Sequence, residues 1–307
     1  IPDLMADSSP SFSHTLVLVA NRDATSLTQV DIHAARDLVH GAAPVTLSEG
    51  EAVEIACHAP STWDAPDIAA LRTVFAGRGM DVLVTPRHGR RKRLLVADMD
   101  STIVNCETLD DIAAHAGIGE KIAEITTRSM NGEIEFEAAL RERVALLRGL
   151  PVNLLDKAWK DVRLNPGALE LVRTMRANGA HTALVSGGFT FFTSRVAQLC
   201  GFNENHANTL LEADERLTGH VGVPILGPDA KLEHLRRLVA HGGIDMHDAM
   251  ATGDGANDLA MLRVAGAGIA FHAKAAVRRE ISNQVNETTL RTLLFAQGYR
   301  ADEFVTA

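Results

Sequence analysis

The stretch LLVADMDSTIVNCE, at Leu94–Glu107, carries two aspartates one residue apart directly after an apolar run. The run Leu94–Ala97 is short and wholly apolar, which is typical of a buried strand. Carboxylates as close as those of Asp98 and Asp100 repel each other unless a cation lies beside them. We therefore expect a metal ion or a basic side chain from elsewhere in the chain at the end of this strand.

From Leu94 onward, predicted strands alternate with predicted helices, which is typical of an α/β fold with a doubly wound, Rossmann-like parallel sheet. The predicted strands are Leu94–Ala97, Ala180–Gly188, a segment within His247–Asp258, and Gly266–Phe271, with a helix at Gly167–Gly179. A largely helical stretch at about 107–163 follows the first strand. Because this stretch is too long for a loop, we expect it to form an inserted helical cap over the sheet.

The first part of the chain has the pattern of a small α+β domain. Predicted strands and helices alternate at His14–Ala20, Leu27–His40, Ala52–Ala59, Ala65–Gly79 and Asp81–Pro86. By fold-level analogy alone, this pattern suits a ferredoxin-like or ACT-like domain with a regulatory or dimerisation role. The basic run RHGRRKR at Arg87–Arg93 follows, and we expect a solvated linker there rather than a nucleic-acid patch. The predicted domains are therefore 1–88 and 93–300.

Composition and charge narrow the function classes. The chain has 307 residues, 46% of them hydrophobic and 22% charged, and a net charge of -9. This charge argues against a general nucleic-acid binder, and no apolar run approaches the roughly 18–20 residues of a membrane span. The three cysteines, Cys57, Cys106 and Cys200, show no CxxC spacing, which favours a reducing compartment. We expect a cytoplasmic protein that binds a small molecule, with a homodimer left open.

Three of the predicted strands end in polar or glycine residues, at the edge where parallel sheets bind ligands. They are Asp98 and Asp100; Ser186, Gly187 and Gly188; and Asp254, Asn257 and Asp258. So many carboxylates at one edge predict a hard cation such as Mg²⁺, which prefers oxygen ligands. The hydroxyl of Ser186, the glycine N–H groups and the ammonium of Lys231, at the start of a predicted helix, suit phosphate oxygens.

These residues follow the order of motifs in a known superfamily. The chain resembles the haloacid dehalogenase-like (HAD) phosphohydrolases, whose DxD, Ser/Thr, Lys and GDxxxD motifs are matched by Asp98–Asp100, Ser186, Lys231 and Gly253–Asp258. Within that superfamily it is most similar to the phosphoserine phosphatases, through DMDSTIVNCE, MNGEIEFEAALRERV, SGGF and GDGANDLAML. The resemblance covers about Leu94–Gly298 and does not extend over residues 1–90.

The resemblance implies Mg²⁺-dependent hydrolysis of O-phospho-L-serine to L-serine and phosphate, the last step of serine biosynthesis. It implies that Asp98 is the nucleophile, which forms an aspartyl-phosphate, and that Asp100 is the general acid and base. Mg²⁺ would be bound by Asp98, the backbone carbonyl of Asp100 and Asp254, with Asp258 in support.

The resemblance also implies a substrate pocket under the cap. Glu107 would bind the ammonium of the substrate and Arg143 its carboxylate, while Met130 and Phe136 would form an apolar wall. The groups expected to bind the phosphoryl oxygens or the rest of the substrate are Ser186, Gly187, Lys231 and Asn257.

Other functions stay open at this point. A phosphotransferase to another hydroxy amino acid, or a phosphatase of a different small phosphomonoester, would use the same catalytic residues. Non-enzymatic alternatives are a phospho-accepting signalling domain and an amino-acid-sensing regulatory protein. Asp100, placed to activate water, and the unbroken motifs favour the phosphatase. Around the site, we expect Thr102 to support the turn and Cys106 to be a packing residue.

Overall fold

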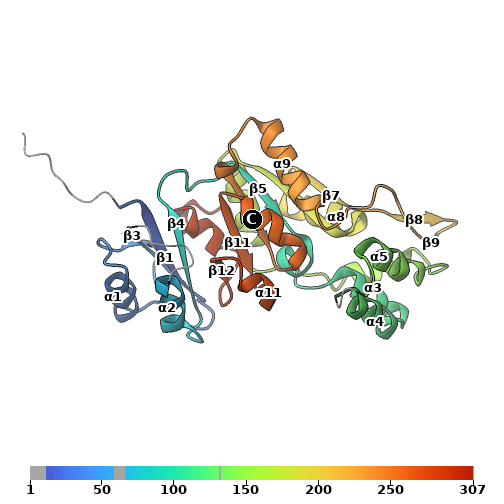
Figure 1. Cartoon of the computed structure of the whole chain (residues 1–307), viewed down its shortest axis with the longest axis horizontal. Coiled ribbons are helices and arrows are strands. Elements are labelled where there is room, and N and C mark those ends of the chain that lie inside the picture. The colour runs from blue at the N-terminus through green and yellow to red at the C-terminus, as the bar shows by residue number, and fades with distance from the viewer. Residues whose placement is uncertain (1–11, 59–65, 131–132, 307) are drawn as a thin grey trace, which may run out of the picture.

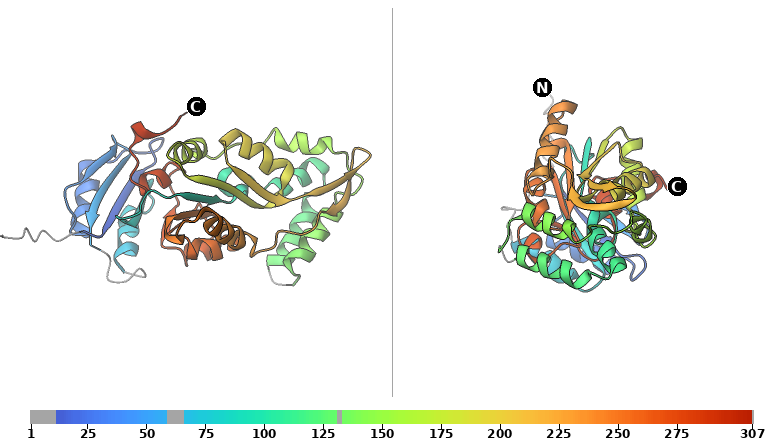
Figure 2. Two further views of the ribbon diagram at one scale, coloured as in Figure 1. Left: turned by 90° about the horizontal axis from the view of Figure 1, so that it is seen from above. Right: turned by 90° about the vertical axis from the view of Figure 1, so that its right-hand side faces the viewer.

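The chain folds into three parts that lie in a row (Figure 1). A computed structural model describes residues 12–58, 66–130 and 133–306, without the side chains of 66–69 and 130. An antiparallel sheet with two helices lies at one end, a parallel sheet lies in the middle, and a group of helices lies at the far end (Figures 1 and 2). The N-terminal part and the far helices therefore lie at opposite ends of the central part (Figures 1 and 2).

The N-terminal part has the element order of a ferredoxin-like unit. Its elements are β1 (His14–Ala20), α1 (Gln29–Leu38), β2 (Val45–Ser48), β3 (Ala52–Cys57), α2 (Pro66–Phe75) and β4 (Met80–Pro86). The sheet order is β2-β3-β1-β4 and every pair is antiparallel, which confirms the predicted α+β class. The prediction lacks β2 because Leu47 is its one buried residue, so that the strand has little apolar alternation.

Six parallel strands form the central sheet, in the order β12-β11-β10-β5-β6-β7, which confirms the predicted doubly wound fold. The strands are β5 (Leu94–Ala97), β6 (His181–Phe189), β7 (Glu204–Asn208), β10 (Ala249–Gly253), β11 (Ala267–Phe271) and β12 (Asn283–Val285). The neighbouring helices are α7 (Ala168–Ala177), α8 (Thr190–Cys200), α9 (Ala230–Gly242), α10 (Leu259–Val264), α11 (Ala275–Arg278) and α12 (Thr292–Ala296). The prediction lacks β7 and β12 because their sequences, ENHAN and NQV, are largely polar.

Helices cover both faces of the central sheet. Successive residues of β5 point to opposite faces, so Leu94 lies in one apolar cluster with Leu235 of α9. Its neighbour Leu95 lies in a second, larger cluster with Met175 of α7. With both faces buried, the carboxyl ends of the strands are the part of the sheet that is available for ligands.

The far helices lie between β5 and α7 in the sequence and form the cap. They are α3 (Thr108–Ala116), α4 (Gly119–Met130), α5 (Phe136–Ala145) and α6 (Asn153–Trp159). A hairpin of β8 (Leu210–Ala213) and β9 (Arg216–Val221) joins them, as Figure 2 shows. The backbone N–H of Gly149 donates to Leu217, and that of Leu217 donates to Leu150. The prediction lacks this hairpin, which extends the cap with a segment from beyond α8.

The N-terminal sheet packs its helix-free face against the central part. Val17 and Val19 of β1 share the large apolar cluster with Leu293 of α12. At the edge of β4, the carboxylate of Asp81 accepts hydrogen bonds from the backbone N–H groups of 286–288, at 2.8 to 3.3 Å. Apolar burial and a charged anchor therefore hold the two parts together.

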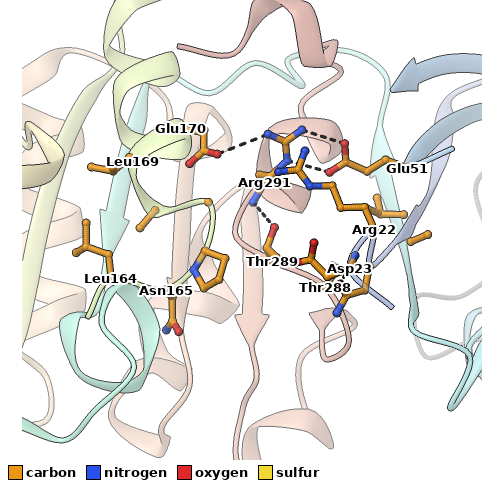
Figure 3. A pocket seen from close by; sticks show the side chains of 16 residues that line it. Arg22, Asp23, Glu51, Leu164, Asn165, Leu169, Glu170, Thr288, Thr289 and Arg291 are labelled. Atoms are coloured by element: carbon orange, nitrogen blue, oxygen red, sulfur yellow. Dashed lines mark hydrogen bonds and ion pairs between the residues drawn. The ribbon is translucent and has the colours of Figure 1, made fainter. Parts of the chain in front are cut away.

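A buried arginine makes a second anchor between these parts. Arg291, 7% exposed, donates from Nε and Nη2 to the two carboxylate oxygens of Glu51, at 2.8 and 2.9 Å. Its Nη1 lies 3.6 Å from the carboxylate of Glu170 on α7, as Figure 3 shows. Arg291 therefore joins the N-terminal part to the central helices through two carboxylates.

The expectation of a solvated linker at Arg87–Arg93 is wrong for two of its residues. Lys92 is 6% exposed, and its ammonium donates to the carbonyls of Gly89 and His247, both at 2.7 Å. Arg90 pairs with Glu54 of β3 at 2.7 Å. The basic run connects the two parts as predicted, but Lys92 is buried against two backbone carbonyls and Arg90 is paired with a carboxylate. The limits 1–88 and 93–300 remain a proposal.

Across the described ranges, no helix is both long enough and apolar enough to cross a membrane. Cys57, Cys106 and Cys200 all carry free thiols.

Candidate active site

The carboxyl ends of β5, β6 and β10 meet at one cavity of about 370 Å³ between the central sheet and the cap. Asp98 and Asp100 both line this cavity, and the turn after β5 continues through Ser101 in a left-handed conformation with φ of 55°. Most of the residues predicted from the three strand ends line this cavity: Asp98, Asp100, Ser186, Gly187, Gly188, Asp254 and Asn257. Lys231 and Asp258 lie deeper, behind Asp98.

Lys231 is the basic side chain beside the paired aspartates. Its Nζ lies 2.8 Å from Oδ2 of Asp98 and 2.6 Å from Oδ1 of Asp258, and it is 4% exposed. Burial acts to lower the pKa of Lys231, but the charges of Asp258 and Asp98 raise it above its ordinary value. Burial raises the pKa of Asp98, and the ammonium of Lys231 opposes that effect. Lys231 therefore stays charged and favours the ionised form of Asp98.

Asp258 orders the loop that follows β10. Its Oδ2 accepts from the backbone N–H groups of Asp254 and Gly255, at 3.1 and 2.9 Å, while its Oδ1 binds Lys231. Both oxygens are thus used within the protein. The GDxxxD spacing therefore places the side chain of Asp258 where it accepts hydrogen bonds from the backbone N–H groups of Asp254 and Gly255.

Asp100 has the environment of a proton donor. Its Oδ1 accepts from the backbone N–H of Thr108 at 3.1 Å, and its Oδ2 lies 3.4 Å from Oγ of Ser186. Burial, and after it the charge of Glu107, raises the pKa of Asp100 to about 7. Near neutral pH a substantial fraction of Asp100 is therefore protonated, as a general acid requires.

The glycines near the end of β6 allow a close approach to Asp100. A Cβ on Gly188 would lie 2.8 Å from Oδ2 of Asp100, so a larger residue there would displace that carboxylate. The N–H of Gly188 donates to Oγ of Ser186 at 2.9 Å. The side chain of Asn208, which the sequence analysis did not single out, donates to the carbonyl of Gly187 at 2.9 Å. Asn208 is the last residue of β7, which the sequence analysis did not predict. Only a prediction of that strand would have placed Asn208 near the site.

Three buried carboxylates are close enough to share a cation. One oxygen each of Asp98, Asp254 and Asp258 lie within 4.8 Å of one another. An all-oxygen donor set of this kind fits a hard divalent cation. Asp98 and Asp258 both also bind Lys231, whereas Asp254 lies on the side of the cluster that faces Lys274. Thr102 was expected to support the turn, and its Oγ1 lies 3.5 Å from Oδ1 of Asp254.

The cap supplies the outer wall of the cavity. Glu107, Phe136 and Arg143 line it together. Nε of Arg143 donates to the carbonyl of Ala139 at 3.3 Å, which directs the guanidinium along α5. The side chain of Met130, predicted for the same wall, lies outside the described residues. Two charges of opposite sign and one aromatic ring therefore face the strand ends from the cap.

Cys106 has the environment of a packing residue. It is partly buried against the large apolar cluster. Burial, with the nearby acids, raises the pKa of its thiol, so it is not a thiolate at neutral pH.

Lys274 is a cavity residue that the sequence analysis did not find. It lies three residues after the end of β11, and its Nζ lies 3.4 Å from Asp254 and 3.6 Å from Glu107. The rule used for the other strand ends would have pointed to it, because β11 was itself predicted.

Comparison with known proteins gives the family. The family model of the haloacid dehalogenase-like hydrolases matches residues 95–263, more than half of the chain. The chain belongs to the haloacid dehalogenase-like hydrolases. The matched residues include every acidic strand end of the site and Lys231. The resemblance stated from the motifs is thereby confirmed.

Individual members of this hydrolase family narrow the comparison. A phosphoserine phosphatase of Streptomyces coelicolor is 42% identical over 240 residues, which are 78% of this chain and 58% of that protein. A phosphoserine phosphatase of Lactococcus lactis is 40% identical over 203 residues, 66% of this chain and 94% of that protein. The chain thus spans little more than half of the first relative's length and nearly all of the second's.

Solved structures of the hydrolase family share the fold. A HAD family hydrolase of Salmonella enterica serovar Typhi superposes with a TM-score of 0.81 at 29% identity, covering 92% of this chain and 98% of that one. A phosphoserine phosphatase in a phospho-aspartyl intermediate analogue form has a TM-score of 0.62 at 38% identity, covering 67% of this chain and 98% of that one. The match to the first structure includes the N-terminal part of this chain. The match to the second is about as long as the central part and cap together.

Proposed function

We propose that this chain hydrolyses O-phospho-L-serine to L-serine and phosphate through an aspartyl-phosphate on Asp98. One observation carries the proposal: a single cavity has Asp98 and Asp100 at its inner end and Glu107 and Arg143 at its cap end. A phosphate ester that also bears an ammonium and a carboxylate matches these charges. The relatives named phosphoserine phosphatase support the same substrate.

In the first step, a carboxylate oxygen of Asp98 attacks phosphorus and the bond to the serine oxygen breaks. Asp100 donates its proton to that leaving oxygen, which its raised pKa of about 7 permits. Lys231, Ser186 and the N–H of Gly187 stabilise the charge on the phosphoryl oxygens.

In the second step, Asp100, now ionised, takes a proton from water as the water attacks the aspartyl-phosphate. Phosphate leaves, and the carboxylate of Asp98 is restored next to Lys231. Asp258 keeps the ammonium of Lys231 directed at the site through its contact of 2.6 Å.

Mg²⁺ fits the donor set, and Asp98, Asp254 and the backbone carbonyl of Asp100 would hold it. When bound, it offsets the repulsion between the carboxylate nucleophile and the anionic phosphate.

The cap residues select the substrate in this proposal. Glu107 binds the ammonium and Arg143 the carboxylate, while Phe136 excludes water from the space between them. Asn257 lines the inner end of the same cavity. A phosphomonoester without the amino-acid group gains no contact with Glu107 or Arg143 and binds more weakly.

Phosphate release from L-phosphoserine tests the proposal, measured with Mg²⁺ and with a chelator, beside a panel of other small phosphomonoesters. We expect Mg²⁺-dependent turnover with kcat/KM for phosphoserine at least tenfold, about 1.4 kcal/mol, above the panel. Even turnover across the panel would keep the hydrolase chemistry and overturn the substrate. Product analysis with an added hydroxy amino acid separates transfer to that acceptor from transfer to water.

A further inference from the structure

Lys274 joins the inner and outer walls of the active-site cavity. It precedes α11, and its backbone N–H donates to the carbonyl of Asp254 at 3.0 Å. Its ammonium lies 3.4 Å from Oδ2 of Asp254 and 3.6 Å from Oε1 of Glu107. The backbone bond fixes the base of the side chain, and the ammonium contacts one carboxylate from the central part and one from the cap.

The charges around the cavity give Lys274 a distinct position. The acidic side chains that line it are Asp98, Asp100, Glu107, Asp110 and Asp254. Lys231 is bound to Asp98 and Asp258, and Arg143 lies on the cap wall. In the described part of the chain, Lys274 is the lysine that pairs with Glu107. Glu107 also accepts a hydrogen bond from the hydroxyl of Ser101 at 2.9 Å, and Arg143 is the other cation that lines the cavity.

The contact between Lys274 and Glu107 can be exchanged. The side chain of Lys274 is 58% exposed and that of Glu107 is 46% exposed. Ion pairs this open to water contribute little to stability, because solvent screens them and both side chains keep their freedom. A second ammonium can therefore replace Lys274 at Glu107 at small cost, and Lys274 then keeps its contact with Asp254.

We propose that Lys274 is a specificity-determining residue that occupies, at Glu107, the place of the substrate ammonium. This inference rests on the proposed function, since it needs a substrate whose ammonium binds Glu107. An amine-bearing substrate displaces Lys274 from Glu107, and the amine-bearing product, L-serine, is displaced by Lys274 in turn. For a phosphomonoester without an amine, Lys274 stays and neutralises Glu107, so that such a substrate is still accepted weakly.

The test compares L-phosphoserine with its amine-free analogue, the phosphate ester of 3-hydroxypropanoate, in three variants. Lys274→Met removes the charge and keeps the length, Lys274→Arg keeps the charge, and Lys157→Met removes an exposed lysine of α6 outside the cavity. Steady-state kinetics give KM and kcat for both substrates, and inhibition kinetics give the Ki of L-serine. Thermal unfolding confirms that each variant is folded.

For Lys274→Met, we expect the KM of phosphoserine and the Ki of L-serine each to fall about threefold, because the competing ammonium is gone. We expect the KM of the amine-free analogue to rise about threefold, because Glu107 and Asp254 now repel it. The preference for phosphoserine thus widens about tenfold. For Lys274→Arg and for Lys157→Met, the preference for phosphoserine over the analogue should stay within twofold of that of the parent.

Two results would overturn the inference. Equal changes for both substrates would mean that Lys274 acts only on the architecture of the site. A larger loss for phosphoserine would mean that Lys274 binds the substrate directly rather than competing with its amine. Failure of the proposed function is distinct, since the parent chain itself would then not turn over phosphoserine.

Discussion

Asn165 is joined to Thr102 by a hydrogen bond of 2.8 Å from its side-chain Nδ2 to the Thr102 carbonyl. The same Nδ2 lies 3.1 Å from the carbonyl of Val104, and the backbone N–H of Asn165 donates to Ile103 at 2.8 Å. Asn165 therefore fixes the turn that carries Asp98 and Asp100. It also lines a cavity of about 320 Å³ between the N-terminal part and the central part, shown in Figure 3.

Asn165→Ala should lower kcat about tenfold and change KM less than threefold. The substitution removes both side-chain bonds to the turn, and small displacements of reacting groups are costly to the rate. Asn153→Ala, at an exposed position on α6, is the control and should leave both constants unchanged. A loss of thermal stability without any change in kcat would show that Asn165 serves the fold alone.

Asp98→Asn should remove turnover, by about 10³-fold or more, and leave the chain folded. The amide has the volume of the carboxylate but is no nucleophile, and Lys231 keeps its contact with Asp258. Phosphate release and circular dichroism make the measurement. Asp229→Asn, an exposed acid just before α9, is the matched control. Substantial hydrolysis by Asp98→Asn would contradict the assignment of the nucleophile.

Arg143→Ala should reduce kcat/KM for phosphoserine by about 10²-fold and for an aryl phosphate by less than threefold. The reason is that only phosphoserine carries the carboxylate that this guanidinium would bind. Arg141→Ala removes an exposed arginine two residues away, paired with Glu137, and should affect neither substrate. Equal losses on both substrates for Arg143→Ala would refute its role in selection.

Glu51→Gln should destabilise the protein by about 2–3 kcal/mol. The buried guanidinium of Arg291 would lose its bidentate partner and keep only the longer contact with Glu170, and unpaired buried charges are costly. Thermal or denaturant unfolding measures the change. Asp302→Asn, whose side chain is exposed and 4.0 Å from Arg300, should have almost no effect. Similar losses in both variants would argue against a special role for Arg291.

Glu204→Gln should reduce stability at neutral pH and have little effect in acid. Although burial acts to raise it, hydrogen bonds from His181, His206 and Arg237 lower the pKa of Glu204 from 4.5 to about 2. A carboxylate with a lowered folded pKa stabilises fully above its unfolded pKa and loses that effect as the pH falls through the folded value. We expect about 1 kcal/mol at pH 7, after allowance for solvent screening, shrinking between about pH 4.5 and 2. A difference that is independent of pH would rule out this cause.

The residues that sequence patterns located are those that lie at the ends of apolar strands. Asp98 and Asp254 each follow a strand, and Ser186 lies near the end of another, and the composition of these strands is visible locally. Because parallel strands end at a common edge, their convergence could be inferred without coordinates. The α/β class and the cap followed from the same local periodicities.

The structural relationships that patterns could not locate join segments far apart in the chain. Asn165 reaches the turn after β5, Lys274 reaches Glu107, and Asn208 supports Gly187 from a polar edge strand. The contact of Arg291 with Glu51 spans 240 positions. The spacing of polar side chains along the sequence does not predict which residues they contact, since any exposed helix or loop carries similar residues.

The sequence by itself therefore determined the sheet, the cap and the acidic strand ends, because short-range apolar periodicity encodes which segments are buried. Only the tertiary structure decided which polar side chains hold those strand ends in place and how the N-terminal part is anchored. Those contacts depend on the distance between residues in space, which local sequence does not specify.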